Sequence, residues 1–128
     1  MDTTIDLNEI DRDIETILKP YIAVNSETGT SGEKSGEAFL MSYLGRLSYF
    51  QKNRDHFGSF PVKDDLLGRA VCWALVKGEG DGTVVMIHHY DVVGVEDFKN
   101  LKEFAFRPDK LEEELKKLSA DLHPEARE

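Results

Sequence analysis

The segment VVMIHHYDVV, residues 84–93, joins an apolar run to side chains that can carry out metal or acid–base chemistry. If it is a β-strand, residues two apart point to the same side, so His89 and Asp91 project together and His88 and Tyr90 project opposite. A carboxylate commonly holds the second ring nitrogen of a metal-bound histidine, which fixes its tautomer and makes it a better donor. A histidine pair that only finds hydrogen bonds at a strand end would give the same spacing, which is common by chance.

Two strands are expected to position these side chains, over residues 69–77 and 83–88, joined by the glycine-rich turn GEGDG. The second strand is apolar on both faces, which is typical of a central strand with helices on both sides of the sheet. The sequence therefore predicts an α/β fold, with the histidine pair at the carboxyl end of a strand, where ligand sites collect. Only one partner strand is clear, so we expect missing strands, exposed sheet edges and self-association.

Helical spacing of apolar residues predicts helices at both ends of the chain. The first begins with Asp6 and Glu9 as a capping box, and Pro20 is expected to end or kink it. The last begins near Pro108, which suits a first helical turn. Its apolar stripe consists of Leu111, Leu115, Leu118 and Leu122.

A third amphipathic helix is predicted over residues 39–50, after the small-residue loop NSETGTSGEKSG. Thr30 and Glu33 offer a second capping box at its start. The following segment, NRDHFGSFPVKDDLLG, has the glycines and proline of turns, so no strand is expected there.

The composition of the 128 residues, with 40% hydrophobic residues, predicts a single domain over residues 1–128. Cys72 is the only cysteine, so it cannot form an internal disulfide, and core packing in a reducing compartment is expected. The acidic start of the chain does not resemble a secretory signal, and no apolar run approaches the roughly 20 residues that span a bilayer. We expect a cytoplasmic protein.

The formal net charge of -9 opposes binding to phosphate backbones, so neither nucleic acid nor an anionic membrane is an expected partner. The acidic residues of the first third form either a solvated helix face or an acidic docking site. The sequence holds no Gly-x-Ser-x-Gly, His-Glu-x-x-His or Cys-x-x-Cys motif, so serine nucleophile chemistry has no support.

Three segments together resemble the amino-terminal part of the M20 metallopeptidase and aminoacylase family: SETGTSGEKSGEAFLMSYL, LLGRAVCWAL and VVMIHHYDVV. The segment HHYDVVGVEDFKNLKEFAF is most similar to a large branch of that family linked to arginine utilisation. The resemblance covers most of the chain. It implies a partial three-layer α/β sheet of a zinc-peptidase-like domain with flanking helices, and a chain that is the amino-terminal fragment of a larger catalytic domain.

The resemblance carries functional roles to two positions. His89 matches a zinc ligand, and Asp91 matches the catalytic-site aspartate that orients it. The family's bridging aspartate, Glu-Glu pair and distal histidine have no match, and Gly94 replaces the proline that often closes the motif. The implied function is metal-dependent hydrolysis of an amide bond in a small peptide or N-acyl amino acid, in arginine catabolism.

A catalytic zinc usually has three protein ligands, so the chain by itself is expected to bind zinc weakly and to be inactive. Cobalt or manganese would also suit nitrogen and oxygen ligands. A second hypothesis stays open, in which the chain is a non-catalytic, acidic α/β protein-binding module whose histidines are structural.

Overall fold

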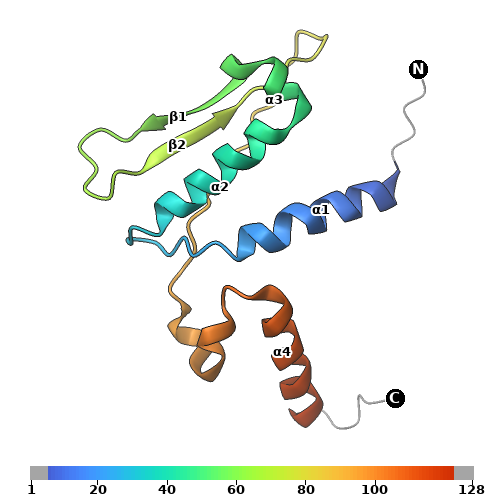
Figure 1. Ribbon diagram of the computed structural model, residues 1–128, viewed down its shortest axis with the longest axis vertical. Helices are drawn as coiled ribbons and strands as arrows, with labels where there is room; N and C mark the ends of the chain where they lie inside the picture. The colour runs from blue at the N-terminus through green and yellow to red at the C-terminus, as the bar shows by residue number, and fades with distance from the viewer. Residues whose placement is uncertain (1–5, 123–128) are drawn as a thin grey trace. The chain divides into compact units, whose positions relative to one another are not determined.

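The computed structural model describes residues 6–122, which form two compact units (Figure 1). One unit is residues 25–94 and the other combines residues 6–24 with 95–122. Helices and a two-stranded antiparallel sheet give a mixed α/β fold, as the sequence predicts. The prediction of a single domain over residues 1–128 stays a prediction.

The sheet is a hairpin of β1 (Phe57–Pro61) and β2 (Ala70–Ala74), paired from Phe57↔Ala74 to Pro61↔Ala70. The prediction that residues 69–77 pair with residues 83–88 is therefore wrong: residues 70–74 do form a strand, but their partner is the segment expected to be turns. Pro61 does not prevent this pairing, because both strands of a two-stranded sheet are edge strands, where the missing N–H is tolerated.

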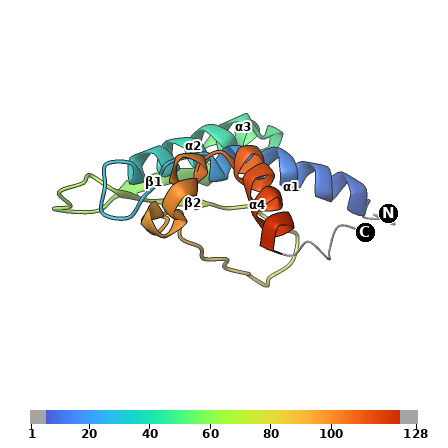
Figure 2. The ribbon, with the colours of Figure 1, turned by 90° about the horizontal axis from the view of Figure 1, so that it is seen from below.

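One face of the hairpin packs against α2 (Glu33–Arg46), which lies along the strands (Figures 1 and 2). Ala70 is buried on this face, and Phe57 contacts Phe50 of α3 (Ser48–Lys52) with ring centroids 5.3 Å apart. A short 3-10 helix, Arg54–His56, connects α3 to β1. The predicted helix over residues 39–50 is thus two helices, separated at Leu47, whose backbone is extended.

Cys72 lies half-buried on β2, and this partial burial raises the pKa of its thiol. Its expected role in core packing stays a prediction. The neighbouring residues of the strands point to the opposite face, where Phe60 and Trp73 stack with ring centroids 5.9 Å apart. Phe60 is 62% exposed, so this face of the hairpin is apolar and open to solvent.

The predicted central strand at residues 83–88 is not formed. Residues 84–87 are between 76% and 92% exposed. A strand that is apolar on both faces is stable only between neighbouring strands and covering helices, and the sheet in the described part of the chain consists of β1 and β2 alone. The segment therefore has the composition of a core strand without the surroundings of one.

In the other unit, α1 (Leu7–Ile22) has the predicted Asp6 as its N-cap, with the Asp6 carboxylate accepting a hydrogen bond from the Asn8 N–H. The part of Glu9 in the predicted capping box stays a prediction. The helix continues two residues past Pro20, because a proline removes a single backbone donor. Two short 3-10 helices within η2 (Val95–Phe104), separated by a kink at Lys99, where φ is 51°, lead to α4 (Pro108–Leu122). Pro108 opens α4 as predicted.

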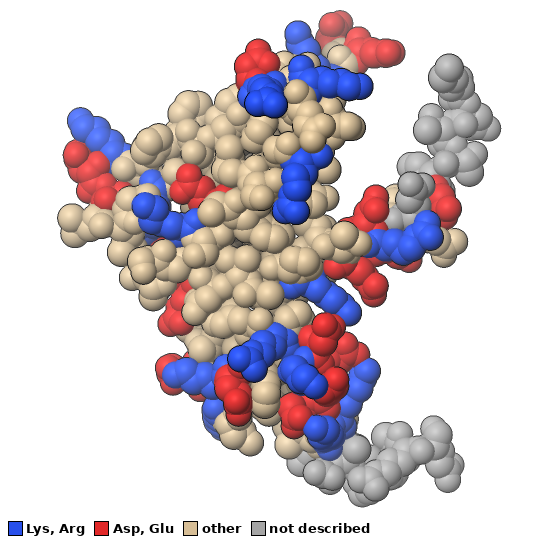
Figure 3. Space-filling model, viewed as in Figure 1, with Lys and Arg blue, Asp and Glu red and all other residues tan. Residues whose placement is uncertain are grey.

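Opposite charges alternate over α4, where blue and red side chains are mixed in Figure 3. Three ion pairs follow the helix: Lys110–Glu113, Lys116–Glu112 and Lys117–Glu114. Exposed pairs of this kind contribute little stability and mainly solvate the helix. None of the described helices is both long and apolar enough to cross a membrane.

Candidate functional site

The loop before α2 is joined to residues 90–92 by backbone hydrogen bonds. The Val92 N–H donates to the Ser26 carbonyl (3.1 Å), and the Thr28 N–H donates to the Val92 carbonyl (2.8 Å). Glu27 and Val92 thereby form a parallel bridge. We call residues 26–28 and 90–92 the clamp. It contains Asp91 and holds the chain next to His89, the two site residues that the sequence predicts.

Tyr90 anchors the clamp to the hairpin and to α2. Its hydroxyl donates to the Ala70 carbonyl at 2.9 Å, and burial raises its pKa. Its ring lies so close to α2 that a Cβ at Gly36 would be 2.7 Å from Cδ2 of the ring. The buried Ser26 hydroxyl donates to the Tyr90 carbonyl at 2.7 Å. A glycine at position 36 is therefore a steric requirement for the position of this tyrosine.

Asp91 follows Tyr90 and turns its carboxylate toward Thr28. The Thr28 hydroxyl lies 2.8 Å from Asp91 Oδ2 and also 2.8 Å from the Val92 carbonyl. The hydrogen bond from Thr28 is the main cause that lowers the pKa of Asp91 below its ordinary value, with a further contribution from His89. Asp91 is thus held as a carboxylate, the form that can orient an imidazole.

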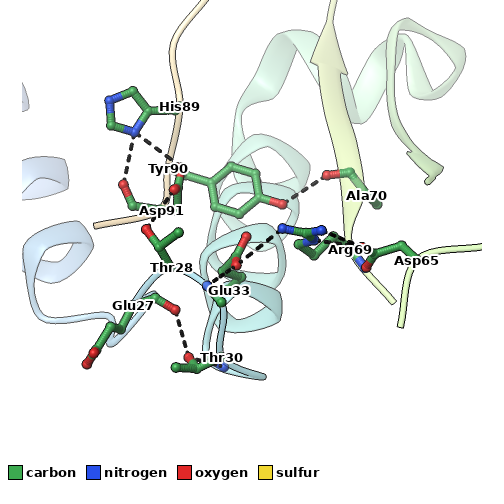
Figure 4. A network of polar contacts seen from close by, with 12 residues as sticks. Glu27, Thr28, Thr30, Glu33, Asp65, Arg69, Ala70, His89, Tyr90 and Asp91 are labelled. Carbon is green, nitrogen blue, oxygen red and sulfur yellow. Dashed lines mark hydrogen bonds and ion pairs between the residues drawn. The ribbon is translucent and has the colours of Figure 1, made fainter. Parts of the chain in front are cut away.

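His89 faces Asp91 through Nδ1. This nitrogen is 2.9 Å from the Asp91 carbonyl oxygen and 3.3 Å from Asp91 Oδ1. The side chain is 84% exposed, and Figure 4 shows the second ring nitrogen pointing away from Asp91. With Nδ1 as the donor to these oxygens, Nε2 is the nitrogen that can bind a metal.

The structure thus brings together the two residues that the sequence singles out, although the predicted strand is not formed. Their roles as metal ligand and orienting aspartate stay predictions. One nitrogen ligand suits zinc chemically, but the described residues contain no group of three or more histidine, cysteine, aspartate or glutamate side chains that could hold a metal ion. His89 fits as one ligand of a metal site and not as a whole site.

The loop that carries Thr28 is fixed by Glu33, and the predicted capping box of Thr30 and Glu33 is not formed. The helix begins at Glu33 with Gly32 as its N-cap, and the Thr30 hydroxyl donates to the Glu27 carbonyl instead (2.7 Å). Buried Glu33 Oε1 accepts a hydrogen bond from the Gly29 N–H at 2.7 Å. The left-handed backbone of Gly29, with φ of 78°, brings this N–H to the carboxylate.

Arg69 connects this loop to the hairpin turn. One of its guanidinium nitrogens lies 3.6 Å from Glu33 Oε1, and the group also donates to Asp65, with Nε at 3.0 Å from Oδ1. The hydrogen bonds from Arg69 lower the pKa of Asp65 to about 2. Glu33, Arg69 and Asp65 therefore form a continuous set of charged contacts from the loop to the hairpin turn (Figure 4).

Ser26, Thr28 and Gly36 are the site residues that the sequence interpretation did not assign. The signal that could have indicated them is the pair of hydroxyls two residues apart in SETG, which matches the spacing of Tyr90 and Val92. Two short extended segments with this spacing can align side by side. Because they are 64 residues apart in the sequence, the pairing cannot be identified without the fold.

Two curated proteins of Bacillus subtilis strain 168 are relatives of this chain. Protein RocB is 33% identical over 102 residues, which is 78% of this chain and 18% of RocB. The uncharacterized protein YqjN is 34% identical over 96 residues, which is 74% of this chain and 17% of YqjN. The chain thus spans less than a fifth of the length of either relative. No family model and no solved structure matches it.

Proposed function

We propose that this chain supplies one metal ligand, His89, and its orienting carboxylate, Asp91, to a metal-dependent amidohydrolase or peptidase. The observation that carries the proposal is the contact of His89 Nδ1 with both the carbonyl and the carboxylate of Asp91. Such a contact holds the imidazole in the tautomer that presents Nε2 to a metal ion. The resemblance to the M20 family supports the same two roles.

The remaining ligands and the general base are proposed to lie outside the described residues. A bound zinc would supply a Lewis acid and a water of lowered pKa for attack on an amide carbonyl. The part played by this chain is to hold the His89 ring in one orientation and to keep Asp91 ionised beside it. The chain by itself is proposed to be inactive and to bind zinc weakly.

The proposed substrate is a small peptide or an N-acyl amino acid, cleaved in the cytoplasm during arginine catabolism. This assignment rests on the resemblance to the arginine-utilisation branch of the M20 family, and the similarity to RocB supports its link to arginine utilisation. The similarity covers a small part of RocB, so the activity of the whole protein is a proposal throughout.

The test begins with the protein as its native cells produce it, isolated with an antibody against this chain. We expect a mass several times the 14.5 kDa of the chain and stoichiometric bound zinc, measured by mass spectrometry and elemental analysis. In the same protein, His89→Ala is expected to lower zinc affinity by at least roughly tenfold and to abolish amide hydrolysis.

His88→Ala is the matched control, because this neighbouring histidine is exposed but is not the one that contacts Asp91. It is expected to leave zinc binding unchanged. If His89→Ala kept both zinc and activity with an intact fold, the metal role would be refuted. The histidines would then be structural, and the non-catalytic, acidic binding module would become the better hypothesis.

A further inference from the structure

The Thr28 hydroxyl has two acceptors within reach and one proton to donate. It lies 2.8 Å from Asp91 Oδ2 and 2.8 Å from the Val92 carbonyl. The Val92 carbonyl already accepts the backbone N–H of Thr28, also at 2.8 Å. A carboxylate is the stronger acceptor of the two. The Thr28 hydroxyl therefore donates its proton to the Asp91 carboxylate rather than to the Val92 carbonyl.

The two oxygens of the Asp91 carboxylate have different partners. Oδ2 receives the Thr28 hydroxyl, whereas Oδ1 faces His89 Nδ1 at 3.3 Å, beside the 2.9 Å contact of the same nitrogen with the Asp91 backbone carbonyl. The carboxylate thus bridges a hydroxyl and an imidazole (Figure 4). A carboxylate attached by two rotatable bonds would otherwise sample several rotamers, which would loosen its hold on the ring.

Thr28 is itself held in place. Its own N–H donates to the Val92 carbonyl. The N–H of Gly29, which follows Thr28, donates to the buried Glu33 carboxylate, and the Ser26 hydroxyl donates to the Tyr90 carbonyl. A hydroxyl on such a fixed backbone can fix a partner in turn.

We propose that Thr28 is a positioning residue: its hydroxyl locks the Asp91 carboxylate, and Asp91 then keeps the His89 ring with Nδ1 inward and Nε2 outward. The inference rests on the proposed function, because it adds a residue to the same site. Thr28 acts through Asp91 and contacts neither metal nor substrate.

The test uses this chain labelled with carbon-13 and nitrogen-15, at an alkaline pH where imidazole is neutral. In the wild type we expect one χ1 rotamer of Asp91, from three-bond couplings, and mainly the Nδ1–H tautomer of His89, from its ring nitrogen shifts. Thr28→Val keeps the shape and removes the hydroxyl. It is expected to average the Asp91 rotamers and to raise the proportion of the Nε2–H tautomer by about threefold, the scale of one lost hydrogen bond.

Two controls separate the positioning role from general damage to the loop. Thr28→Ser keeps the hydroxyl and is expected to retain the wild-type rotamer and tautomer. Thr30→Val removes another hydroxyl of the same loop, one that donates to the Glu27 carbonyl, and is expected to do the same. A folded Thr28→Val with unchanged rotamer and tautomer would overturn the proposal, as would an equal effect of Thr30→Val.

If Thr28→Val does not fold, the measurements on the wild type test the proposal. Averaged Asp91 rotamers overturn it, and a single Asp91 rotamer with a slowly exchanging Thr28 hydroxyl proton supports it. These readouts do not involve metal or activity. A His89→Ala protein that keeps its zinc would remove the proposed function and leave the link between Thr28 and Asp91 unaffected. An unchanged tautomer in Thr28→Val would remove that link and leave the metal role of His89 open.

Discussion

The two halves of VVMIHHYDVV have opposite environments in the structure. Residues 84–87 are apolar and almost fully exposed, whereas residues 90–92 are tied to the loop before α2 by backbone and side-chain hydrogen bonds. The first half needs neighbouring strands, and the sheet of the described residues offers it none. The second half finds its partners in Ser26 and Thr28.

This contrast shows that a site can be organised without a finished sheet. The clamp depends on a few specific donors and acceptors within one compact unit, although the residues that it joins are 64 positions apart in the sequence. A core strand depends on burial from both sides, which requires a larger number of partners. The following variants test whether the two halves differ in this way.

The largest effect is expected at Gly36. In Gly36→Ala the new methyl would lie 2.7 Å from the Tyr90 ring, so Tyr90 must move, at a cost of about 1–3 kcal/mol in unfolding free energy. Gly45→Ala in the same helix is the control, because its methyl would meet Phe57 at an ordinary 3.7 Å, and a gain of about 0.5–1 kcal/mol is expected. Urea unfolding measures both. Equal effects of the two variants would contradict the steric role of Gly36.

Tyr90→Phe is expected to cost about 1 kcal/mol, because the Ala70 carbonyl loses its hydrogen bond while the ring keeps its packing. Urea unfolding and the amide shift of Val71, which follows Ala70 in β2, would detect the change. A variant as stable as the wild type would show that Tyr90 stabilises the clamp through the packing of its ring and not through its hydroxyl.

Acid should weaken the support of the clamp through Asp65. Its pKa is lowered to about 2 by Arg69, whereas an unfolded aspartate titrates near about 3.9. The contribution of Asp65 to the unfolding free energy is therefore present above about pH 4 and is lost as the pH falls toward 2. Unfolding free energy of the wild type and Asp65→Asn, measured against pH, should converge over this window. A constant difference down to pH 2 would contradict the assignment.

The smallest effect on stability is expected in the exposed half. Ile87→Ser should change the unfolding free energy by less than about 0.5 kcal/mol, because this side chain is 92% exposed. The same variant should lessen the predicted self-association, measured by sedimentation across a wide concentration range. A wild type that stays monomeric over that range would refute self-association through the apolar segment and the sheet edges.

Sequence patterns predicted local features well. The Asp6 cap of α1 and the Pro108 start of α4 depend on residues within one turn, and both are present. The two-residue spacing of His89 and Asp91 anticipated their contact, although the strand expected to present them is not formed and the shorter contact of His89 is with the Asp91 backbone carbonyl. The strand pairing was predicted wrongly because β1 carries a glycine and a proline, which indicate turns, while residues 83–88 have the β-branched composition of a strand.

The sequence by itself determined the mixed α/β class, the helices at both ends and the pairing of an imidazole with a carboxylate two residues away. These follow from backbone propensity and side-chain spacing, which act over a few residues. Only the tertiary structure decided that Thr28 meets Asp91, that Tyr90 packs on Gly36 and that β1 is the partner of β2. These contacts join distant segments, and their choice depends on which arrangement satisfies the buried hydrogen-bonding groups and fits the ring of Tyr90 against the glycine.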